Sequence, residues 1–415
     1  MKKKDLLIMC QFFYPEYVSS ATLPFDTAKA LADKGYSIGV LCGYPKEYTE
    51  EHKIPRREIF EGIEIKRIKY IQTGRKGFLG RLINYFSFTI STWLNLREAR
   101  KYKAVMVYSN PPILPQLAVT AKKRYGNKMI FVSYDVYPEI ALQSGALGEG
   151  SMITKMFTRI NRQLFEASDC VVALSDDMKQ YLENNRPISS ECRVVKIPNW
   201  FEDHGESPKR DIAYHPLFSH IEKDDFVVSY LGNLGTCQDE TTILEAIRIL
   251  KDDPKIKFVF AGHGNKMAEL KRVIEQESLT NVACFDFLKG EDYRVALSVS
   301  DCYIVSLIDG LLGLCSPSKA YGYMMQGRPV ACIMDPQSEL ARDLEDRRAG
   351  KCFACGDGSG LAEFFIHLRQ NPKICREMGQ RCREVYLEKY EKERCLEKYV
   401  QLVDELLRPQ ERKEP

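Results

Sequence analysis

The chain has 415 residues, more than one hydrophobic core usually serves and enough for two domains of about 200 residues each. Hydrophobic residues make up 44% and charged residues 28% of it, a globular profile that excludes collagen-like, coiled-coil and wholly disordered chains. Sixty Lys and Arg against 57 Asp and Glu give a formal charge of +3, so the overall charge predicts no nucleic-acid partner.

The charge is unevenly distributed, with a basic segment at residues 66–103. This segment holds one acid, Glu98, and ten basic residues: Lys66, Arg67, Lys69, Arg75, Lys76, Arg81, Arg97, Arg100, Lys101 and Lys103. Such a local excess favours binding to an anionic membrane surface. No stretch reaches the roughly 18 apolar residues of a membrane span, and the short N-terminal apolar run predicts a strand rather than a signal peptide. We therefore expect a cytoplasmic protein, either free or peripheral at the inner face of the plasma membrane.

The 14 cysteines do not form the pattern of a disulfide scaffold. Most lie singly inside apolar runs, where a reduced cysteine behaves as a small hydrophobic residue. One close pair, Cys352 and Cys355, lacks a matching second pair, which disfavours a zinc site. We expect no metal site.

In the N-terminal half, short apolar runs alternate with amphipathic stretches. We expect strands over residues 6–10, 37–42, 104–108, 129–133 and 170–174, a helix over 22–34 and a hairpin around 59–68. A helical pattern follows each of the later strands. This alternation predicts the β–α–β units of a doubly wound parallel sheet.

The pattern breaks near residues 198–200 and restarts after a polar segment. In the C-terminal half we expect strands over residues 226–231, 257–261, 282–285, 302–307 and 329–334, and helices over 240–250, 266–277, 292–298 and 318–325. The sequence therefore predicts an α/β chain of two Rossmann-like domains, 1–203 and 225–387, which face each other across a central cleft. Residues 204–224 are the expected linker, and a C-terminal helix within 388–415 is expected to cross back to the first domain.

Ligands of open parallel sheets bind beyond the carboxyl ends of the strands, so the loops that follow strands are the candidate sites. One such loop carries Gly232 and Gly235 directly before a helix. Glycines let the backbone approach a ligand, and a helix N-terminus attracts an anion. Glycine at a strand–helix turn is also common for steric reasons alone, so both interpretations stay open.

A sharper pattern lies in residues 305–330, where a glycine-containing loop ends in the tetrapeptide 316–319 and a helix begins. Ser318 is placed to cap this helix, and its hydroxyl and the first N–H groups can receive an anion. Lys319 adds a full positive charge beside them. A diphosphate requires these features. The alternative is an ordinary Ser-capped helix with a solvated lysine.

Two loops of the N-terminal half place carboxylates beside aromatic rings. Tyr14 and Glu16 follow the first strand, and Asp135, Tyr137 and Glu139 follow the 129–133 strand. Aromatic rings with convergent hydrogen-bonding groups suit a sugar or a similar polyol. The alternative, in which the carboxylates cap helices and the tyrosines pack on a rim, is stronger for Glu16 than for Asp135 and Glu139.

The stretch 77–96 has apolar residues at helical spacing, among them Phe78, Leu82, Phe86 and Trp93. Because basic residues flank it, a helix lying at the surface of a membrane is one interpretation. A helix buried against the first sheet is the other. Burial explains the apolar content equally well but not the charges.

Six segments occur in the order in which a known family has them: FFYPE, ALADKGYSIGVLCGYP, IPNW, GNLGTCQ, AGHGNK and SPSKAYGYMMQGRPV. Together they resemble family 4 of the retaining glycosyltransferases, which have the two-domain GT-B fold. Within this family the chain is similar to the bacterial branch that transfers N-acetylated amino sugars during O-antigen, capsule or exopolysaccharide assembly. The resemblance covers nearly the whole chain.

The resemblance implies that the C-terminal domain binds a nucleotide-sugar donor, here expected to be a UDP-sugar. By motif position, the donor site would consist of Gly235 and Gln238 near the phosphates, Phe287 and Leu288 at the base, Asp309 and Gly310 at the sugar, and Ser318 and Lys319 on the diphosphate. Cationic side chains and a helix N-terminus would replace a metal at the departing phosphate. The resemblance therefore implies no metal and no cofactor.

The resemblance also implies that the N-terminal domain binds a glycan or lipid-linked acceptor. Asp135 and Glu139 would face the reacting centre together with the charge of Lys319, and Tyr14, Glu16 and Tyr137 would lie on the acceptor side. The acceptor, the linkage and the transferred sugar are not encoded in a motif that we can identify.

This sequence departs from the family pattern at several positions. Many members carry two glutamates eight positions apart, the second of which holds the ribose, and the corresponding residues here are Leu314 and Gly322. The usual glycine pair after the first strand is Ser19 and Ser20, and no histidine lies in the usual catalytic region. Two other functions therefore stay open, a nucleotide-sugar 2-epimerase of the same fold and a catalytically degenerate scaffold.

Overall fold

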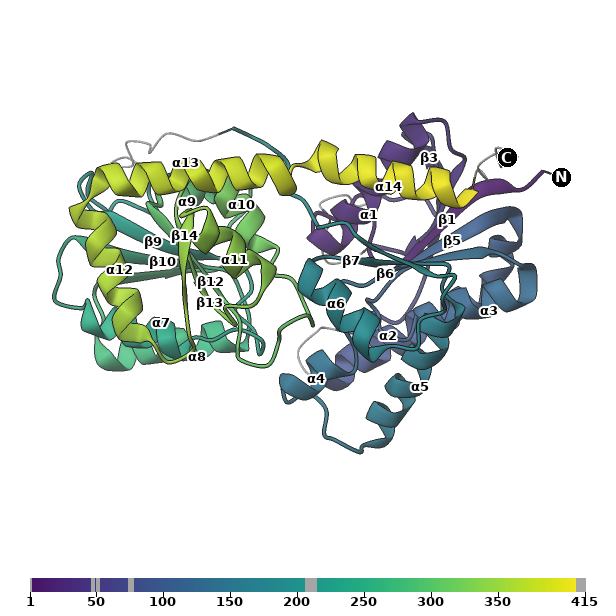
Figure 1. Cartoon of the computed structure of the whole chain (residues 1–415), viewed down its shortest axis with the longest axis horizontal. Coiled ribbons are helices and arrows are strands. Elements are labelled where there is room, and N and C mark those ends of the chain that lie inside the picture. The colour runs from purple at the N-terminus through teal and green to yellow at the C-terminus, as the bar shows by residue number, and fades with distance from the viewer. Residues whose placement is uncertain (1, 46–48, 50–52, 74–77, 206–214, 408–415) are drawn as a thin grey trace. The chain divides into compact units, whose positions relative to one another are not determined.

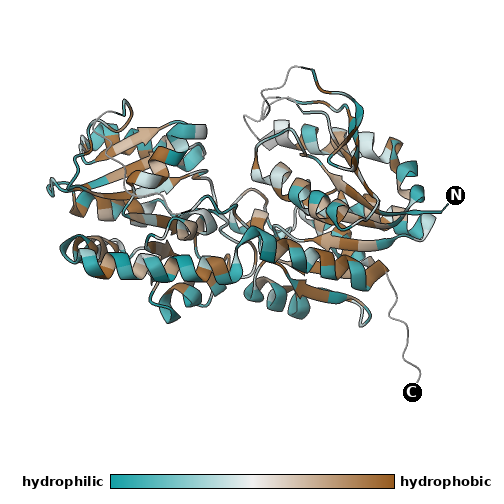
Figure 2. Ribbon diagram, turned by 90° about the horizontal axis from the view of Figure 1, so that it is seen from above, coloured by the Kyte–Doolittle hydropathy of each residue, from teal (hydrophilic) through white to brown (hydrophobic). Residues whose placement is uncertain are grey.

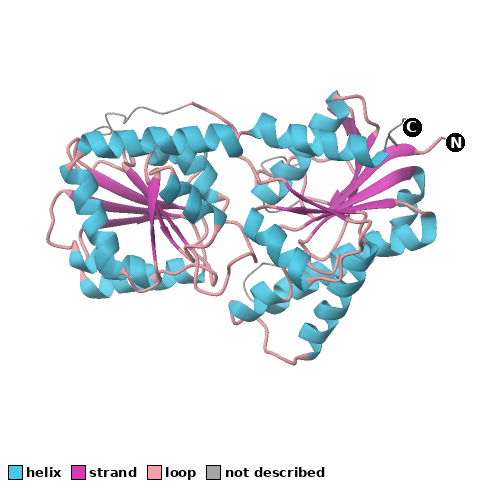
Figure 3. Cartoon of the chain, viewed as in Figure 1, coloured by secondary structure: helices cyan, strands magenta, loops and turns pink. Residues whose placement is uncertain are grey.

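The computed structural model describes residues 2–45, 49, 53–73, 78–205 and 215–407. The chain forms two compact units (Figure 1). Unit 1 contains residues 1–199, 313–316 and 393–415, and unit 2 contains residues 200–312 and 317–392. In both units a sheet is enclosed by helices (Figure 3).

The described part of unit 1 contains a sheet with the strand order β3-β4-β2-β1-β5-β6-β7-β8. These strands are β1 Lys4–Cys10, β2 Ile38–Gly43, β3 Arg57–Phe60, β4 Ile63–Ile68, β5 Tyr102–Tyr108, β6 Lys128–Val132, β7 Cys170–Ala173 and β8 Arg193–Lys196. All neighbouring pairs are parallel except β3 and β4. In the centre, Leu6 of β1 pairs with Ile38 and with Ala104. Strands covered on both faces are expected to be apolar, and these central strands are so apart from Lys4, Asp5 and Lys103 near their N-terminal ends.

Helices cover both faces of this sheet. They are α1 Ser19–Asp33, α2 Phe78–Leu94, α3 Pro115–Tyr125, α4 Glu139–Gln143, α5 Met152–Ala167, α6 Asp176–Asn185 and α14 Lys392–Leu407, with a 3-10 turn η1 at Leu96–Lys101. Figure 1 shows α1 and α14 on one face, and α2, α3 and α5 on the other. Helix α14 is attached beside α1, since the Tyr36 hydroxyl donates to Asp404 and Lys34 lies 3.6 Å from Glu397.

The described part of unit 2 contains an all-parallel sheet with the order β11-β10-β9-β12-β13-β14. Its strands are β9 Phe226–Leu231, β10 Ile256–Ala261, β11 Val282–Phe285, β12 Cys302–Ser306, β13 Val330–Ile333 and β14 Gly350–Phe353. Its helices are α7 Thr241–Ile249, α8 Asn265–Glu277, α9 Gly290–Val299, α10 Lys319–Met325, α11 Glu339–Asp346, α12 Gly358–Gln370 and α13 Pro372–Lys389. Hydrophobic residues concentrate in the strands of both sheets (Figure 2).

The predicted fold class, two Rossmann-like α/β domains, is confirmed. The strands and the hairpin expected in unit 1 occur within a few residues of their expected positions. Strands β8 and β14 were not predicted, because each is only four residues long and contains just two apolar residues, flanked by Arg193 and Lys196 in β8 and preceded by Lys351 in β14. Both are edge strands, and edge strands carry a weaker hydrophobic pattern than central ones.

The C-terminal helical segment is divided in two. Helix α13 ends at Lys389 and α14 begins at Lys392. Between them, the carbonyl of Tyr390 accepts a hydrogen bond from the Phe201 N–H (3.4 Å), and the Tyr386 hydroxyl donates to the Phe201 carbonyl (2.9 Å). The chain thus re-enters unit 1 at residue 393. Part of the expected linker, residues 206–214, lies outside the described residues.

Among the helices of the described ranges, none combines the length and the apolar character that crossing a bilayer requires.

We predict that Gly379→Ala destabilises the protein. A Cβ at Gly379 would lie 2.2 Å from the Gly327 carbonyl oxygen, which is too close for any side chain. Alanine favours a helix by about 1 kcal/mol over glycine, but relieving the clash costs roughly 1–3 kcal/mol. Urea unfolding should therefore show a net loss for Gly379→Ala. The neighbouring exposed substitution Gln380→Ala should change the free energy of unfolding by less than about 0.5 kcal/mol, and equal or greater stability of Gly379→Ala would contradict the prediction.

Candidate functional site

Two glycine loops are in direct backbone contact at the carboxyl ends of β9 and β10. The Gly232 N–H donates to the Ala261 carbonyl at 2.7 Å. A Cβ at Gly262 would lie 2.0 Å from the Gly232 oxygen, and a Cβ at Gly264 would lie 2.1 Å from the Leu234 oxygen. All three glycines have positive φ, a conformation that other residues rarely adopt. This edge of unit 2 therefore presents backbone rather than side chains.

Lys319, the first residue of α10, lies across the end of β9. Its Nζ is 5.1 Å from the centroid of the Tyr230 ring, a cation–π contact. Its Cε lies 2.9 Å from the position that a Cβ of Gly232 would take, so the glycine gives the lysine its room. The Tyr230 hydroxyl donates to the Asn233 carbonyl at 2.9 Å, and burial raises the pKa of Tyr230. A neutral, fixed ring thus holds an ammonium group at the carboxyl end of β9.

The attachment of α10 does not depend on a serine cap. Ser318 is at the N-cap position as expected, but its side chain makes no capping hydrogen bond, so the predicted cap is wrong. The Ala320 N–H instead donates to the Pro317 carbonyl at 3.1 Å. The helix is anchored further along by Tyr323, whose hydroxyl donates to the Leu231 carbonyl at 2.8 Å.

Gly235 and Gln238 are joined by two hydrogen bonds. The Gln238 Oε1 accepts from the Gly235 N–H at 2.7 Å, and the Gln238 N–H donates to the Gly235 carbonyl at 3.2 Å. This closes the loop after β9 into a fixed turn. In the described structure both residues therefore shape the loop, and a contact of either with donor phosphates stays a prediction.

The remaining expected donor residues follow β11 and β12. Phe287 is 48% exposed, and its ring lies 5.9 Å from that of His263 in the second glycine loop. Leu288 is partly buried, whereas Asp309 and Gly310 are exposed. Burial and the nearby carboxylates of Asp239 and Asp309 raise the pKa of Cys355 to about 12. All the expected donor residues of unit 2 thus follow strands of one sheet, at the edge where parallel sheets bind ligands.

Asp135 follows β6 in unit 1 and lies in a small cavity. Ser109 accepts hydrogen bonds through its Oγ from the N–H groups of Tyr134 (3.0 Å) and Asp135 (3.1 Å), which fixes the loop. The cavity, about 10 Å³, is also lined by Ser133 and Asn161. Burial raises the pKa of Asp135 from 3.8 to about 6. A carboxyl group with such a pKa can gain or lose a proton near neutral pH.

Glu139 makes an ion pair four residues further along. Its Oε2 lies 2.5 Å from the Arg186 Nη2, which also donates to the Tyr137 carbonyl at 3.3 Å. The Arg186 guanidinium lies over the rings of Phe165 (5.7 Å) and Tyr181 (5.8 Å). Glu139 therefore positions the loop, while the expected catalytic role of its carboxylate stays a prediction.

The segment 313–316 packs in unit 1 against the Asp135 loop. The Val136 N–H donates to the Leu314 carbonyl at 2.8 Å, and Asp135 forms an isolated antiparallel bridge with Cys315. The Gly313 N–H donates to Asp177 at 3.1 Å. Gly313 has φ +72°, and a Cβ there would lie 2.8 Å from the Tyr181 Cβ. Sequence patterns gave no sign of this contact, because it joins residues far apart in the chain.

Leu314 and Gly322 stand where many members of the resembling family carry glutamates, and both have structural roles here. Leu314 is buried at 3% exposure beside the Asp135 loop. Gly322 lies under Phe201, and a Cβ there would lie 3.2 Å from the Phe201 Cε2. A glutamate at 322 would require the Phe201 ring to move. The Phe201 ring thus packs on Gly322 and fills the space that a glutamate side chain at this position would need.

The expected acceptor-side residues Tyr14 and Glu16 are built into the loop after β1. The Tyr14 ring stacks on Phe60 at 4.2 Å, and its carbonyl accepts from the buried Arg67 at 2.8 Å. Glu16 is 6% exposed and accepts from the Phe13 N–H at 3.4 Å. Tyr137, the third of these residues, lines the Asp135 cavity.

Sequence reasoning missed Tyr230 and Tyr323, which fix Lys319 and α10. The only sequence signal was a tyrosine one turn from Lys319 and another inside an apolar strand, and neither reveals a contact across the sheet. Within the described residues, no group of three or more His, Cys, Asp and Glu side chains is arranged to hold a metal ion.

Comparison with protein families identifies both halves of the chain. The model of the glycosyl transferase 4-like domain matches residues 25–200, and that of the glycosyl transferases group 1 matches residues 217–385. A probable glycosyltransferase, WbjE of Pseudomonas aeruginosa, is 26% identical over 335 residues, which cover 79% of this chain and 80% of WbjE. The putative colanic acid biosynthesis glycosyl transferase WcaI of Escherichia coli is 23% identical over 345 residues, which cover 80% and 84%.

The fold is also that of a solved structure. Anabaena Alr3699/HepE, crystallised in complex with UDP and glucose, has a TM-score of 0.71 with this chain at 13% identity. The match covers 97% of this chain and 99% of HepE. At this identity the match establishes the two-domain fold.

We predict a pH-dependent stability effect for Asp135→Asn. Because its pKa is raised, the folded protein holds this proton between about pH 4 and pH 6 while the unfolded chain has lost it, so wild-type stability falls as pH rises through that window. The variant should therefore gain roughly 2 kcal/mol relative to wild type between pH 4 and pH 7. Urea unfolding at both pH values measures the gain. Asp252→Asn, at an exposed carboxyl, is the matched control, and a pH-independent difference for Asp135→Asn would refute the prediction.

Proposed function

We propose that this chain, which belongs to the glycosyltransferases with a glycosyl transferase 4-like domain and a group 1 domain, transfers a sugar from a UDP-sugar to a glycan or lipid-linked acceptor in surface polysaccharide biosynthesis. Its relatives WbjE and WcaI are named as glycosyltransferases, the latter of colanic acid biosynthesis. HepE, which shares the fold, binds UDP and glucose. These similarities support the donor class and the pathway class.

The observation that carries this proposal is the position of Lys319. Its ammonium lies over Tyr230 at the carboxyl end of β9, beside glycine loops that expose backbone. Glycosyl transfer breaks the bond between sugar C1 and the diphosphate, so negative charge develops on the departing oxygen. A fixed cation placed there stabilises the transition state without reorganising. We assign Lys319 to the diphosphate and expect transfer to proceed without a metal ion.

The acceptor is assigned to unit 1, where Asp135 lies in its cavity. In a retaining reaction, the acceptor oxygen bonds to C1 on the face that the diphosphate leaves. The acceptor proton passes to the departing phosphate oxygen, which balances the charges. Asp135, as a carboxylate above about pH 6, would accept a hydrogen bond from the acceptor hydroxyl and orient it. The resemblance to the amino-sugar branch favours an N-acetylated amino sugar as the transferred group.

Removing the Lys319 charge tests the donor assignment. Lys319→Ala should lower kcat/KM for the donor by about 100-fold, the typical effect of losing one group that stabilises developing charge. The measurement is UDP release from a panel of UDP- and GDP-sugars with lipid-linked acceptors. Lys351→Ala is the matched control, because Lys351 makes a similar cation–π contact with Phe353 (5.2 Å) in the same unit.

Three results would redirect the assignment. Turnover of Lys319→Ala within about twofold of wild type would remove Lys319 from the reaction. Sugar release from the donor alone with inversion at C2 would identify a 2-epimerase. Calorimetry without UDP binding at millimolar nucleotide would indicate a scaffold, which the replaced glutamate positions at Leu314 and Gly322 favour.

The proposed function includes a peripheral membrane location through α2. One side of this helix is buried at Asn84, Phe88 and Thr92. The other side exposes five large apolar residues at helical spacing: Ile83 (37%), Phe86 (42%), Ile90 (57%), Trp93 (57%) and Leu94 (68%). We call these five residues the α2 stripe. Helix α2 thus supports both interpretations of the sequence, since it packs on the sheet and presents an apolar stripe to the outside.

The charges near α2 are fewer than the sequence indicates. Arg67 is buried and pairs with Glu58 at 2.6 Å, while Lys66 and Lys101 both pair with Glu98 and Lys103 pairs with Asp5. Lys69, Arg97 and Arg100 are exposed. Arg75, Lys76 and the side chain of Arg81 lie outside the described residues. The exposed cations that flank α2 in the chain support attraction to an anionic bilayer.

We expect Trp93→Ser/Leu94→Ser to reduce vesicle binding by at least tenfold, because burial of two large apolar side chains contributes roughly 1.5–3 kcal/mol each. The fraction of protein that co-sediments with vesicles of phosphatidylcholine and phosphatidylglycerol measures this binding. Ile249→Ser/Ile374→Ser removes two exposed apolar residues of unit 2 and should leave binding unchanged. If the Trp93 and Leu94 variant sedimented like this control, the α2 stripe would not be the membrane contact.

A further inference from the structure

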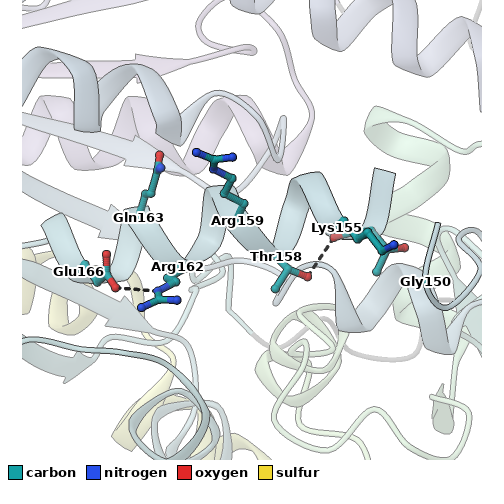
Figure 4. Close-up of a pocket in the computed structure, with 8 residues that line it drawn as sticks. Gly150, Lys155, Thr158, Arg159, Arg162, Gln163 and Glu166 are labelled. Atoms are coloured by element: carbon teal, nitrogen blue, oxygen red, sulfur yellow. Dashed lines mark hydrogen bonds and ion pairs between the residues drawn. The ribbon is translucent and has the colours of Figure 1, made fainter. Parts of the chain in front are cut away.

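We infer that the outer side of α5 is a second contact with the membrane, a site for the phosphate groups of anionic lipids. This inference rests on the proposed membrane association and deepens it. It concerns a hollow of about 650 Å³ along α5, shown in Figure 4. The residues that line it are Gly150, Thr154, Lys155, Thr158, Arg159, Arg162, Gln163 and Glu166.

The hollow carries a cationic row. Lys155, Arg159 and Arg162 follow one another at intervals of four and three residues, so they share one side of the helix. Figure 4 shows their side chains projecting from α5. Arg162 is paired with Glu166 at 2.9 Å, whereas Lys155 and Arg159 are exposed and have no ion-pair partner in the described part of the chain. Two adjacent cations are thus available for an anion.

Helix α5, which carries these cations, is capped at its N-terminus and packed against the core of unit 1. Its first turn is capped by Ser151, whose Oγ accepts from the Thr154 N–H at 3.1 Å. Its inner side is buried at Phe157, Leu164 and Phe165. Less conformational entropy is therefore lost when a ligand binds than at a flexible loop.

Two features favour a lipid surface over a soluble anion. Met152, at the start of α5, is 88% exposed, which places an apolar side chain about one turn before Lys155. Helices α2 and α5 both contact α3 on the same face of the sheet (Figure 1). The α2 stripe and the cationic row therefore belong to helices that cover the same face of the sheet in unit 1, which is compatible with one interfacial surface.

Phosphate is the group that these side chains recognise. A guanidinium binds two phosphate oxygens at once, and an ammonium adds a point charge. Asn161 of α5 lines the Asp135 cavity and is buried, whereas the residues of the row are exposed. A headgroup bound there leaves that cavity accessible, so the site serves attachment rather than transfer.

The test compares the full chain with Lys155→Gln/Arg159→Gln. Vesicles of phosphatidylcholine alone and of phosphatidylcholine with phosphatidylglycerol are the probes, and glycerol phosphate in solution is the soluble arm. Each lost charge should weaken binding to the mixed vesicles about fivefold, with no change on neutral vesicles. Lys373→Gln/Arg376→Gln removes two exposed charges of unit 2 and is the matched control. Thermal unfolding checks that each variant is folded.

The outcomes separate this site from the membrane association itself. Binding of Lys155→Gln/Arg159→Gln to mixed vesicles at the level of its control overturns the α5 site and leaves the α2 contact standing. Loss of glycerol phosphate binding in this variant without an effect on vesicles assigns the site to soluble phosphates and overturns the lipid assignment. Failure of the wild-type chain to bind any vesicle overturns the membrane association on which this inference depends.

Discussion

Close approach of two backbones at the ends of β9 and β10 is the constraint on which the proposed donor site depends. Gly262 and Gly264 leave no room for a side chain between the loops, and Gly232 leaves room only for the stem of Lys319. The lysine is thereby brought over Tyr230, while Tyr323 ties its helix to β9. A bulky residue at any of these glycines would displace the loop and the cation together. The position of the Lys319 ammonium group therefore depends directly on the backbone conformation of the glycine loops.

Close packing also accounts for the absence of a glutamate at position 322. In unit 2 the Phe201 ring occupies the space over Gly322, and Phe201 is itself held by Tyr386 and Tyr390 at the junction of α13 and α14. An aromatic contact that fixes the chain at this junction has taken the place of a polar group expected at the ribose. Under the proposed function, the ribose would be held by other residues of this edge, and the charge of Lys319 would contribute a larger share of donor binding.

Local patterns were sufficient for the fold but not for the site. Apolar runs such as 6–10 and 226–231 predicted the central strands, because burial on both faces dictates their composition. Lys319 could be singled out by its place after a strand. Its support by Tyr230, the pairing of Glu139 with Arg186 and the contact of buried Arg67 with the Tyr14 carbonyl could not, since each joins residues remote in sequence. The positive charge that residues 66–103 present to solvent was accordingly overestimated, because several of their basic side chains form ion pairs within unit 1.

The segment 313–316 limits how this chain can be recombined with its relatives. It is flanked by residues of unit 2, yet its backbone bonds to Val136 and Asp177 of unit 1. A hybrid enzyme joined at a single crossover near residue 200 would bring a foreign tetrapeptide against the native Asp135 loop. An exchange of halves between relatives therefore also requires a graft of these four residues, so that the Asp135 loop keeps its native contacts.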